Sequence, residues 1–266
     1  MPNIISFIKN IILSRSMLWN LAKNDLKERY SGSILGLAWA IVQPLFTICV
    51  MWFVFSFGFR TVPIDDVPFI LWLSAGMIPW FFMSEAFITT ANCIVEKAYL
   101  VKKVVFNITL LPIVKIASLL FVHLFFVALL VLMFGIYGYY PNMMYLQLIY
   151  YVVAAACLIL ALSYITSSIV VFSKDFGQLI GIVVQFLFWA TPIFWNLTLI
   201  PTGYRWIFKL NPCWYIVNGY RDTLIYQKWF WQIPVETITF WSITCAVGLI
   251  GIMLFKKLRP HFADVL

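Results

Sequence analysis

Charged residues are scarce in this chain of 266 residues, and their scarcity excludes a water-soluble globular protein. Only 11% of the residues are charged, whereas 64% are hydrophobic and 19% are aromatic. A soluble domain usually has about 25% charged residues with which to cover its surface. Lipid must therefore be the solvent for most of this chain.

The residue types that most enzymes and metal sites need are also few. The chain has two histidines and five cysteines, and they are not grouped with carboxylates at the spacing of metal ligands. It contains no G-x-x-x-x-G-K-[ST] run, which is the loop that binds nucleotide phosphates. We expect a protein that is not an enzyme, needs no cofactor or metal of its own, and relies on a partner for ATP hydrolysis.

Long apolar runs are abundant instead. A membrane-spanning helix needs about 20 mostly apolar residues. The sequence has six such runs, at residues 34–57, 67–90, 106–136, 145–172, 176–196 and 235–255. They predict an all-α membrane protein with six transmembrane helices, organised as a single domain over residues 1–266.

The positions of the basic residues predict the orientation of these spans. Most lysines and arginines precede the first run, follow the sixth, or lie between the second and third and the fourth and fifth. With six spans these segments share one side, which the positive-inside rule makes cytoplasmic. We therefore expect both termini to be cytoplasmic, and we attribute the net charge of +8 to this asymmetry rather than to nucleic-acid binding.

Residues 17–30 predict an amphipathic helix at the cytoplasmic surface, because helical winding gathers their polar side chains on one face. Asp25 and Arg29 are four residues apart and are spaced so that they can pair. The helix either anchors on anionic headgroups or offers a docking surface to a cytoplasmic protein. The residues that we expect on that surface are Lys23, Asp25, Lys27, Arg29 and Tyr30.

The loop at residues 96–106 reads EKAYLVKKVVF and is long enough for a short helix. It is either a positively charged stop signal or a helix that presses into a groove on another protein. In the second interpretation the contacting residues are Glu96, Lys97, Tyr99, Leu100, Lys102 and Lys103.

Residues 197–228 are rather apolar, but prolines and a glycine interrupt them. Because Pro212 disfavours helical geometry at Asn211, we expect two short helices at residues 204–210 and 214–226. They form either an amphipathic cap or a re-entrant hairpin that dips into the outer leaflet. In the re-entrant hairpin, the cations face water, headgroups or a central pathway.

Three ionisable residues fall within the predicted spans. Glu85 and Lys115 lie near the cytoplasmic ends of their runs, so they can reach the interface or pair with each other. His123 stands alone, and a proton relay would need several such groups in series.

Aromatic side chains are more numerous in the runs than belts at the two interfaces require. The apolar C–H face of a sugar ring can rest on an aromatic plane. Beyond the belts, the aromatic residues that we expect along a glycan path are Trp52, Phe55, Trp80, Phe186, Trp189, Phe194 and Trp195.

Several stretches together resemble the permease subunit of bacterial ABC exporters of O-antigen, capsular polysaccharide or teichoic acid. They are LAKNDLKERYSGSILGLAWAIVQPL at residues 21–45, AGMIPWFFMSEA at 75–86, LVKKVVF at 100–106, LNP at 210–212, YRDTL at 220–224 and RPHFADVL at 259–266. The resemblance covers the whole chain, and the first stretch is the most specific. The sequence departs from the family pattern after Phe106, where a proline and charged residues are common and Asn107, Ile108 and Thr109 stand instead.

The resemblance implies a homodimer with a central channel in the bacterial cytoplasmic (inner) membrane, together with two cytoplasmic ATPase subunits that bind Mg-ATP. Residues 17–30 would lie at the ATPase interface, residues 96–105 would form the coupling helix, and residues 197–228 would form the external gate. The gate residues that we select are Asn211, Pro212, Tyr215 and Arg221.

The expected function is ATP-driven export of a lipid-linked polysaccharide, with membrane lipids around the permease. One alternative is an exporter of drugs or small lipids with the same architecture. Another is a membrane glycosyltransferase or acyltransferase, against which the lack of an acid and base constellation argues.

Overall fold

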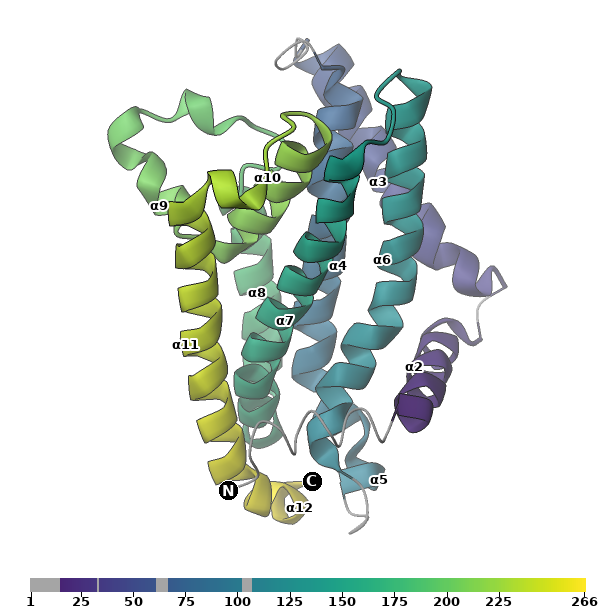
Figure 1. The fold of residues 1–266 in the computed structure, drawn as a ribbon. Coiled ribbons are helices and arrows are strands. Elements are labelled where there is room, and N and C mark those ends of the chain that lie inside the picture. The colour runs from purple at the N-terminus through teal and green to yellow at the C-terminus, as the bar shows by residue number, and fades with distance from the viewer. Residues whose placement is uncertain (1–14, 33, 61–66, 102–106) are drawn as a thin grey trace.

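The computed structural model of the chain describes residues 15–32, 34–60, 67–101 and 107–266, and in these ranges every regular element is a helix (Figure 1). The longer helices are α2 (Arg15–Tyr30), α3 (Trp39–Phe53), α4 (Phe69–Glu96), α6 (Leu111–Ile136), α7 (Gln147–Phe172), α8 (Asp175–Ala190), α10 (Pro212–Leu224) and α11 (Pro234–Leu258). The shorter ones are α5 (Ala98–Val101), α9 (Arg205–Lys209) and α12 (Phe262–Val265), and brief 3-10 and π turns extend several helix ends.

Helical segments in the described part of the chain include five that are long and apolar enough to cross a membrane. They are Gly36–Gly58, Phe69–Glu96, Ile108–Ile136, Met143–Phe172 and Pro234–Val265. Each coincides with a predicted run, so the prediction of an all-helical, multi-pass membrane protein is confirmed.

The remaining predicted run, residues 176–196, differs from the structure in the length of its helix. α8 has 16 residues, and a helix of this length extends about 24 Å, which is less than the roughly 30 Å of a bilayer core. It ends at Ala190 because Pro192 disfavours helical geometry at Thr191, which is extended.

Helix α4 occupies the centre of the bundle, where it packs against α6, α7, α8 and α10. In its most apolar stretch 78% of the residues are buried, compared with 11% in the segment that contains α3. Small residues such as Ala75, Gly76 and Ala86 are buried along α4, and they let neighbouring helices approach its backbone closely.

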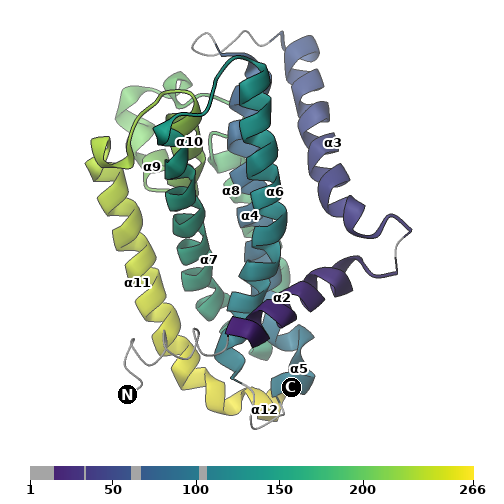
Figure 2. The ribbon, with the colours of Figure 1, turned by 45° about the vertical axis from the view of Figure 1, so that its right-hand side comes forward.

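Helix α3 stands apart from the other long helices, as Figure 2 shows. Large apolar side chains on it are exposed, including Phe46 and Phe53, and so is Phe57 in the π turn that follows. Such a surface is compatible with lipid or with another membrane helix, because neither requires polar groups.

The two ends of the bundle carry different elements. α2, α5 and α12 lie at one end, together with the C-terminus, whereas α9, α10 and the α6–α7 connection lie toward the other (Figure 1). The segments predicted to be cytoplasmic and described in the structure therefore lie at the same end.

Candidate functional site

An ion-pair network joins α2 to the neighbouring ends of α4 and α6. Nζ of Lys115, on α6, lies 2.7 Å from Oδ1 of Asp25 on α2 and 2.8 Å from Oε2 of Glu96 at the end of α4. The Ser118 hydroxyl donates a hydrogen bond to the second oxygen of Asp25, at 2.8 Å. Three helices that are distant in sequence thus meet at a single ammonium group.

The centre of this network is buried. The side chain of Asp25 is 5% exposed and that of Lys115 is 9% exposed, and α2 packs Leu18 and Ala22 against α6 beside them. Removing one partner of a buried pair leaves an uncompensated charge, which costs about 3–5 kcal/mol. The pair therefore fixes the position of α2 chiefly because it is costly to break.

Two further ion pairs hold the last turn of α2 to α4. Lys97 binds Glu28, and Arg29 binds Glu85. Burial lowers the pKa of Lys97, but the hydrogen bond to Glu28 and its negative charge outweigh that effect and raise the pKa overall. Because both carboxylates are more than half exposed, each pair contributes at most about 1 kcal/mol.

Two charge pairings that the sequence allows are not formed in the structure. Asp25 and Arg29 do not bind each other, because Asp25 faces α6 whereas Arg29 faces α4. Glu85 and Lys115 each pair with a residue of α2 instead of with each other. Of the other residues predicted on the docking surface, Lys23 and Lys27 are exposed and Tyr30 is partly buried.

The segment predicted to couple the chain to a partner begins where α4 ends. The amide of Leu100 donates to the Lys97 carbonyl, and the leucine side chain packs against a cluster that contains Phe262 of α12. Tyr99 is 57% exposed at the end of the bundle, and Glu96 is bound to Lys115 as described above. The predicted contacts Lys102 and Lys103 lie outside the described residues.

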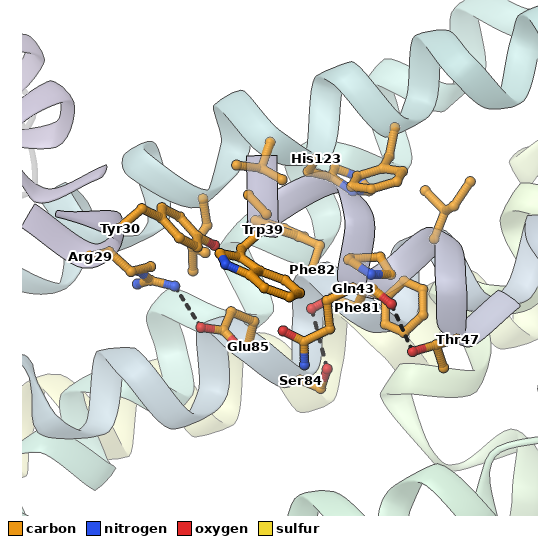
Figure 3. Close-up of a pocket in the computed structure, with 16 residues that line it drawn as sticks. Arg29, Tyr30, Trp39, Gln43, Thr47, Phe81, Phe82, Ser84, Glu85 and His123 are labelled. Carbon is orange, nitrogen blue, oxygen red and sulfur yellow. Dashed lines mark hydrogen bonds and ion pairs between the residues drawn. The ribbon is translucent and has the colours of Figure 1, made fainter. Parts of the chain in front are cut away.

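A groove of about 410 Å³ begins beside the Arg29–Glu85 pair and runs between α3, α4 and α6 (Figure 3). Both polar and aromatic side chains line it, among them Trp39, Gln43, Thr47, Phe81, Phe82, Ser84 and Phe126.

His123 lines the groove, and its polar contact within the described part of the chain is with a tyrosine. Its Nε2 atom is 2.8 Å from the Tyr220 hydroxyl, and its ring stacks on Phe82. No sequence pattern indicates the histidine–tyrosine pair, since the two residues are 97 positions apart.

The aromatic residues predicted along a glycan path divide into two groups. Trp52, Phe186 and Trp189 are 37%, 70% and 58% exposed. The others pack within the protein: Phe55 lies 5.5 Å from Phe194, Trp80 lies 5.7 Å from Phe188, and Trp195 lies 5.4 Å from Phe208, all between ring centroids. Contact of either group with a glycan stays a prediction.

The residues predicted at the external gate fix the start of α10. The Asn211 side chain accepts a hydrogen bond from the Cys213 amide and donates one to the Thr191 hydroxyl, while Pro212 occupies the first helical turn. The Tyr215 hydroxyl is 2.9 Å from that of Tyr150. These contacts place the N-terminus of α10 against α7 and the end of α8.

Arg221 of α10 is only 3% exposed, so the expectation that its charge faces water, headgroups or a pathway is wrong. Its guanidinium donates to the carbonyls of Trp72, Pro192 and Ile193, and it lies 3.4 Å from the centroid of the Trp72 ring. The break after α8 frees carbonyls from helical hydrogen bonding, and arginine supplies several donors in one plane.

A glycine on α4 makes room for this arginine. A Cβ atom added at Gly76 would lie 2.5 Å from Nη2 of Arg221. In the sequence, Pro192 indicates that α8 ends and Gly76 indicates a close approach to α4. Neither residue indicates that Arg221 is the side chain that fills the space between them.

Comparison with known proteins gives a consistent picture. The family model described as ABC-2 type transporter matches residues 17–225. The chain is 24% identical to an O-antigen export system permease protein RfbA from Klebsiella pneumoniae over 92% of this chain and 93% of the relative. It is 26% identical to a protein of the same name from Myxococcus xanthus, over 98% and 99% of the two chains.

Proposed function

Since this chain belongs to the ABC-2 type transporter family, we propose that it is the permease subunit of an ATP-driven exporter that moves a lipid-linked polysaccharide across the bacterial cytoplasmic membrane. The relatives named O-antigen export permeases favour an O-antigen among the polysaccharide classes, which also include capsule and teichoic acid. The alignments cover nearly the whole of each relative, which supports a shared role for the complete chain.

In this proposal two copies of the permease form a channel, and two copies of a separate ATPase bind Mg-ATP beneath it. The end of the bundle with α2, α5 and α12 faces the cytoplasm, together with both termini. α8 and the segment that follows it complete a sixth crossing, and α9 with α10 forms the re-entrant hairpin of an external gate.

The observation that carries the proposal is the attachment of α2 to the two helices that flank the coupling segment. Lys115 links Asp25 of α2 to Glu96, the last residue of α4. Lys97, which lies between α4 and α5, binds Glu28 of α2. In this proposal α2 is the docking helix and residues 96–105 are the coupling segment, so an ATPase that pushes on either one moves both.

The attachment also gives that motion a route into the membrane. α4 is the central helix of the bundle and α6 packs along it. A displacement of α2 acts on α6 through the buried Asp25–Lys115 pair, which is costly to break. It acts on α4 through weaker, more exposed pairs and through the bond of Lys115 to Glu96. The motion therefore reaches the most buried part of the permease rather than only its surface.

An exporter of drugs or small lipids with the same architecture is the alternative. Purified permease and ATPase, co-expressed and reconstituted in liposomes, distinguish the two. We expect polyprenyl-linked glycan to stimulate ATP hydrolysis and to become accessible on the opposite side of the membrane. Stimulation by hydrophobic drugs but not by glycolipid would refute the proposal, as would failure of the two subunits to associate.

A further inference from the structure

The groove beside α2 places polar side chains within a membrane-spanning segment. Gln43 is exposed in the first half of the span Gly36–Gly58, and Thr47 lies at its middle. Ser84 and Glu85 face them from α4, and the Glu85 side chain is 51% exposed. The Thr47 and Ser84 hydroxyls donate to the carbonyls of Gln43 and Phe81, and each can still accept a hydrogen bond from a ligand. Because polar groups that face lipid are costly, the exposed amide of Gln43 above all calls for an occupant that forms hydrogen bonds.

Aromatic faces lie beside these polar groups. Trp39 is 43% exposed in the groove, and Phe81 and Phe82 contribute to its wall. The labelled side chains of α3 and α4 point toward one another across this space (Figure 3). A ligand that fits must combine an apolar face with several hydroxyl or amide groups.

The charge of the groove is balanced. Arg29 and Glu85 bind each other at its α2 end, so the pair presents no net charge to a ligand. An anionic headgroup or a diphosphate would therefore find no excess cation here, whereas a neutral polyhydroxyl group can bond to both partners and to Gln43. The volume of about 410 Å³ lies within the range of small-ligand pockets, about 300–1,000 Å³.

We propose that this groove binds a sugar residue of the lipid-linked glycan, close to its lipid anchor, with Trp39 as the stacking surface and Gln43 as a hydrogen-bonding group. The inference rests on the proposed function and adds a substrate site to it. The site lies between helices of one copy, on α3, α4 and α6, and it is distinct from the exposed aromatic face of α8. Its position in the half of the span nearest α2 places it where a substrate made in the cytoplasm would arrive.

The test uses the complete permease–ATPase assembly in nanodiscs of phosphatidylethanolamine and phosphatidylglycerol. The first probe is polyprenyl diphosphate bearing a disaccharide with a photoreactive diazirine on the sugar next to the diphosphate, and the second is sugar-free polyprenyl diphosphate. We expect the first probe to cross-link peptides of α3 and α4 that line the groove. Gln43→Leu should weaken binding of that probe by about twofold to tenfold, since one hydrogen bond is lost.

Gln43→Leu should leave the affinity for the sugar-free probe unchanged. Gln185→Leu is the matched control, because it removes an exposed glutamine from α8, outside the groove, and it should bind both probes as the wild type does. Trp39→Phe keeps an aromatic plane and should bind the disaccharide probe more tightly than Trp39→Leu.

Cross-links confined to other surfaces would overturn the inference, and so would a Gln43→Leu variant that binds both probes normally or loses both equally. An equal loss would mean that the groove holds the lipid or its diphosphate. If glycolipid stimulates hydrolysis by the wild-type assembly but the groove is not labelled, only this inference fails. If no polyprenyl-linked glycan stimulates hydrolysis, the proposed function fails as well.

Discussion

Replacing Lys115 with methionine should separate ATP hydrolysis from transport. Methionine has a similar length but no charge, so Asp25, whose side chain is 5% exposed, would remain buried beside an apolar group. An unpaired buried charge of this kind costs about 3–5 kcal/mol. Asp25 can avoid that cost by turning toward water, which requires α2 to leave α6. The variant should therefore retain an attached ATPase but transmit little of its motion.

The assay is the ratio of glycolipid transported to ATP hydrolysed by the reconstituted assembly, measured together with its thermal stability. Lys115→Met should lower both the ratio and the stability. Asp25→Asn combined with Lys115→Met should recover part of the stability, because the buried charge is then absent, but it should not restore the ratio. The matched control is Lys209→Met, which removes the Lys209–Glu236 pair at the opposite end of the bundle.

Two results would refute this reasoning. If Lys115→Met and Lys209→Met lower the transport ratio and the thermal stability equally, the attachment of α2 to α6 has no special role in coupling. If the double variant is less stable than Lys115→Met alone, the cost does not come from an unpaired carboxylate. Lys97→Met should lower the thermal stability and the transport ratio less than Lys115→Met does and more than Lys209→Met does. The exposed pair that it breaks contributes at most about 1 kcal/mol.

Three further predictions concern the outer end of the bundle and the orientation of the chain. Gly76→Ala should destabilise the assembly on thermal unfolding because its Cβ would displace the Arg221 guanidinium, whereas Gly181→Ala, which meets no described atom within 4 Å, should be neutral or stabilising by up to about 1 kcal/mol. Arg221→Lys should also lower thermal stability, because one ammonium group cannot reproduce donation to three carbonyls and stacking on a ring; unchanged unfolding would contradict the buried contacts. In a background without native cysteines, a membrane-impermeant maleimide should label Tyr99→Cys only from the cytoplasmic side and Tyr204→Cys only from outside, and the reverse pattern would show that the orientation is inverted.

The membrane helices could be predicted from the sequence because hydrophobicity over about 20 residues is a local property. α3, α4, α6, α7 and α11 all overlap predicted runs. Hydropathy overestimates the length of α8 because residues 191–196 are mostly apolar, although Pro192 ends the helix. Hydropathy measures the cost of leaving water, whereas the backbone geometry around a proline determines where a helix stops.

The contacts of the candidate site could not be predicted, because they depend on how helices far apart in sequence are arranged. Asp25 has one neighbour of opposite charge at helical spacing, Arg29, but its partner is Lys115, 90 positions away. Arg221 lies in a segment whose other cations are the exposed Lys209 and Lys228 and the partly buried Arg205. Only the arrangement of α4 and the end of α8 around it shows that three carbonyls replace water.

The coupling network and the groove share the last turns of α2, and this arrangement relates substrate binding to nucleotide binding. Asp25 and Glu28 hold α2 to the ends of α6 and α4, while Arg29 lines the mouth of the groove. If an ATPase displaces α2 at Asp25 and Glu28, Arg29 on the same helix must move too. The Arg29–Glu85 pair that borders the bound sugar then moves with it. Linkage makes such coupling reciprocal: if nucleotide changes the affinity of the groove for glycolipid by some factor, glycolipid must change the affinity for nucleotide by the same factor. If α2 couples the two sites, these two factors should be equal in the wild type, and both should approach one in Lys115→Met. If the groove and the nucleotide site are independent, replacing Lys115, which touches neither ligand, should change neither factor.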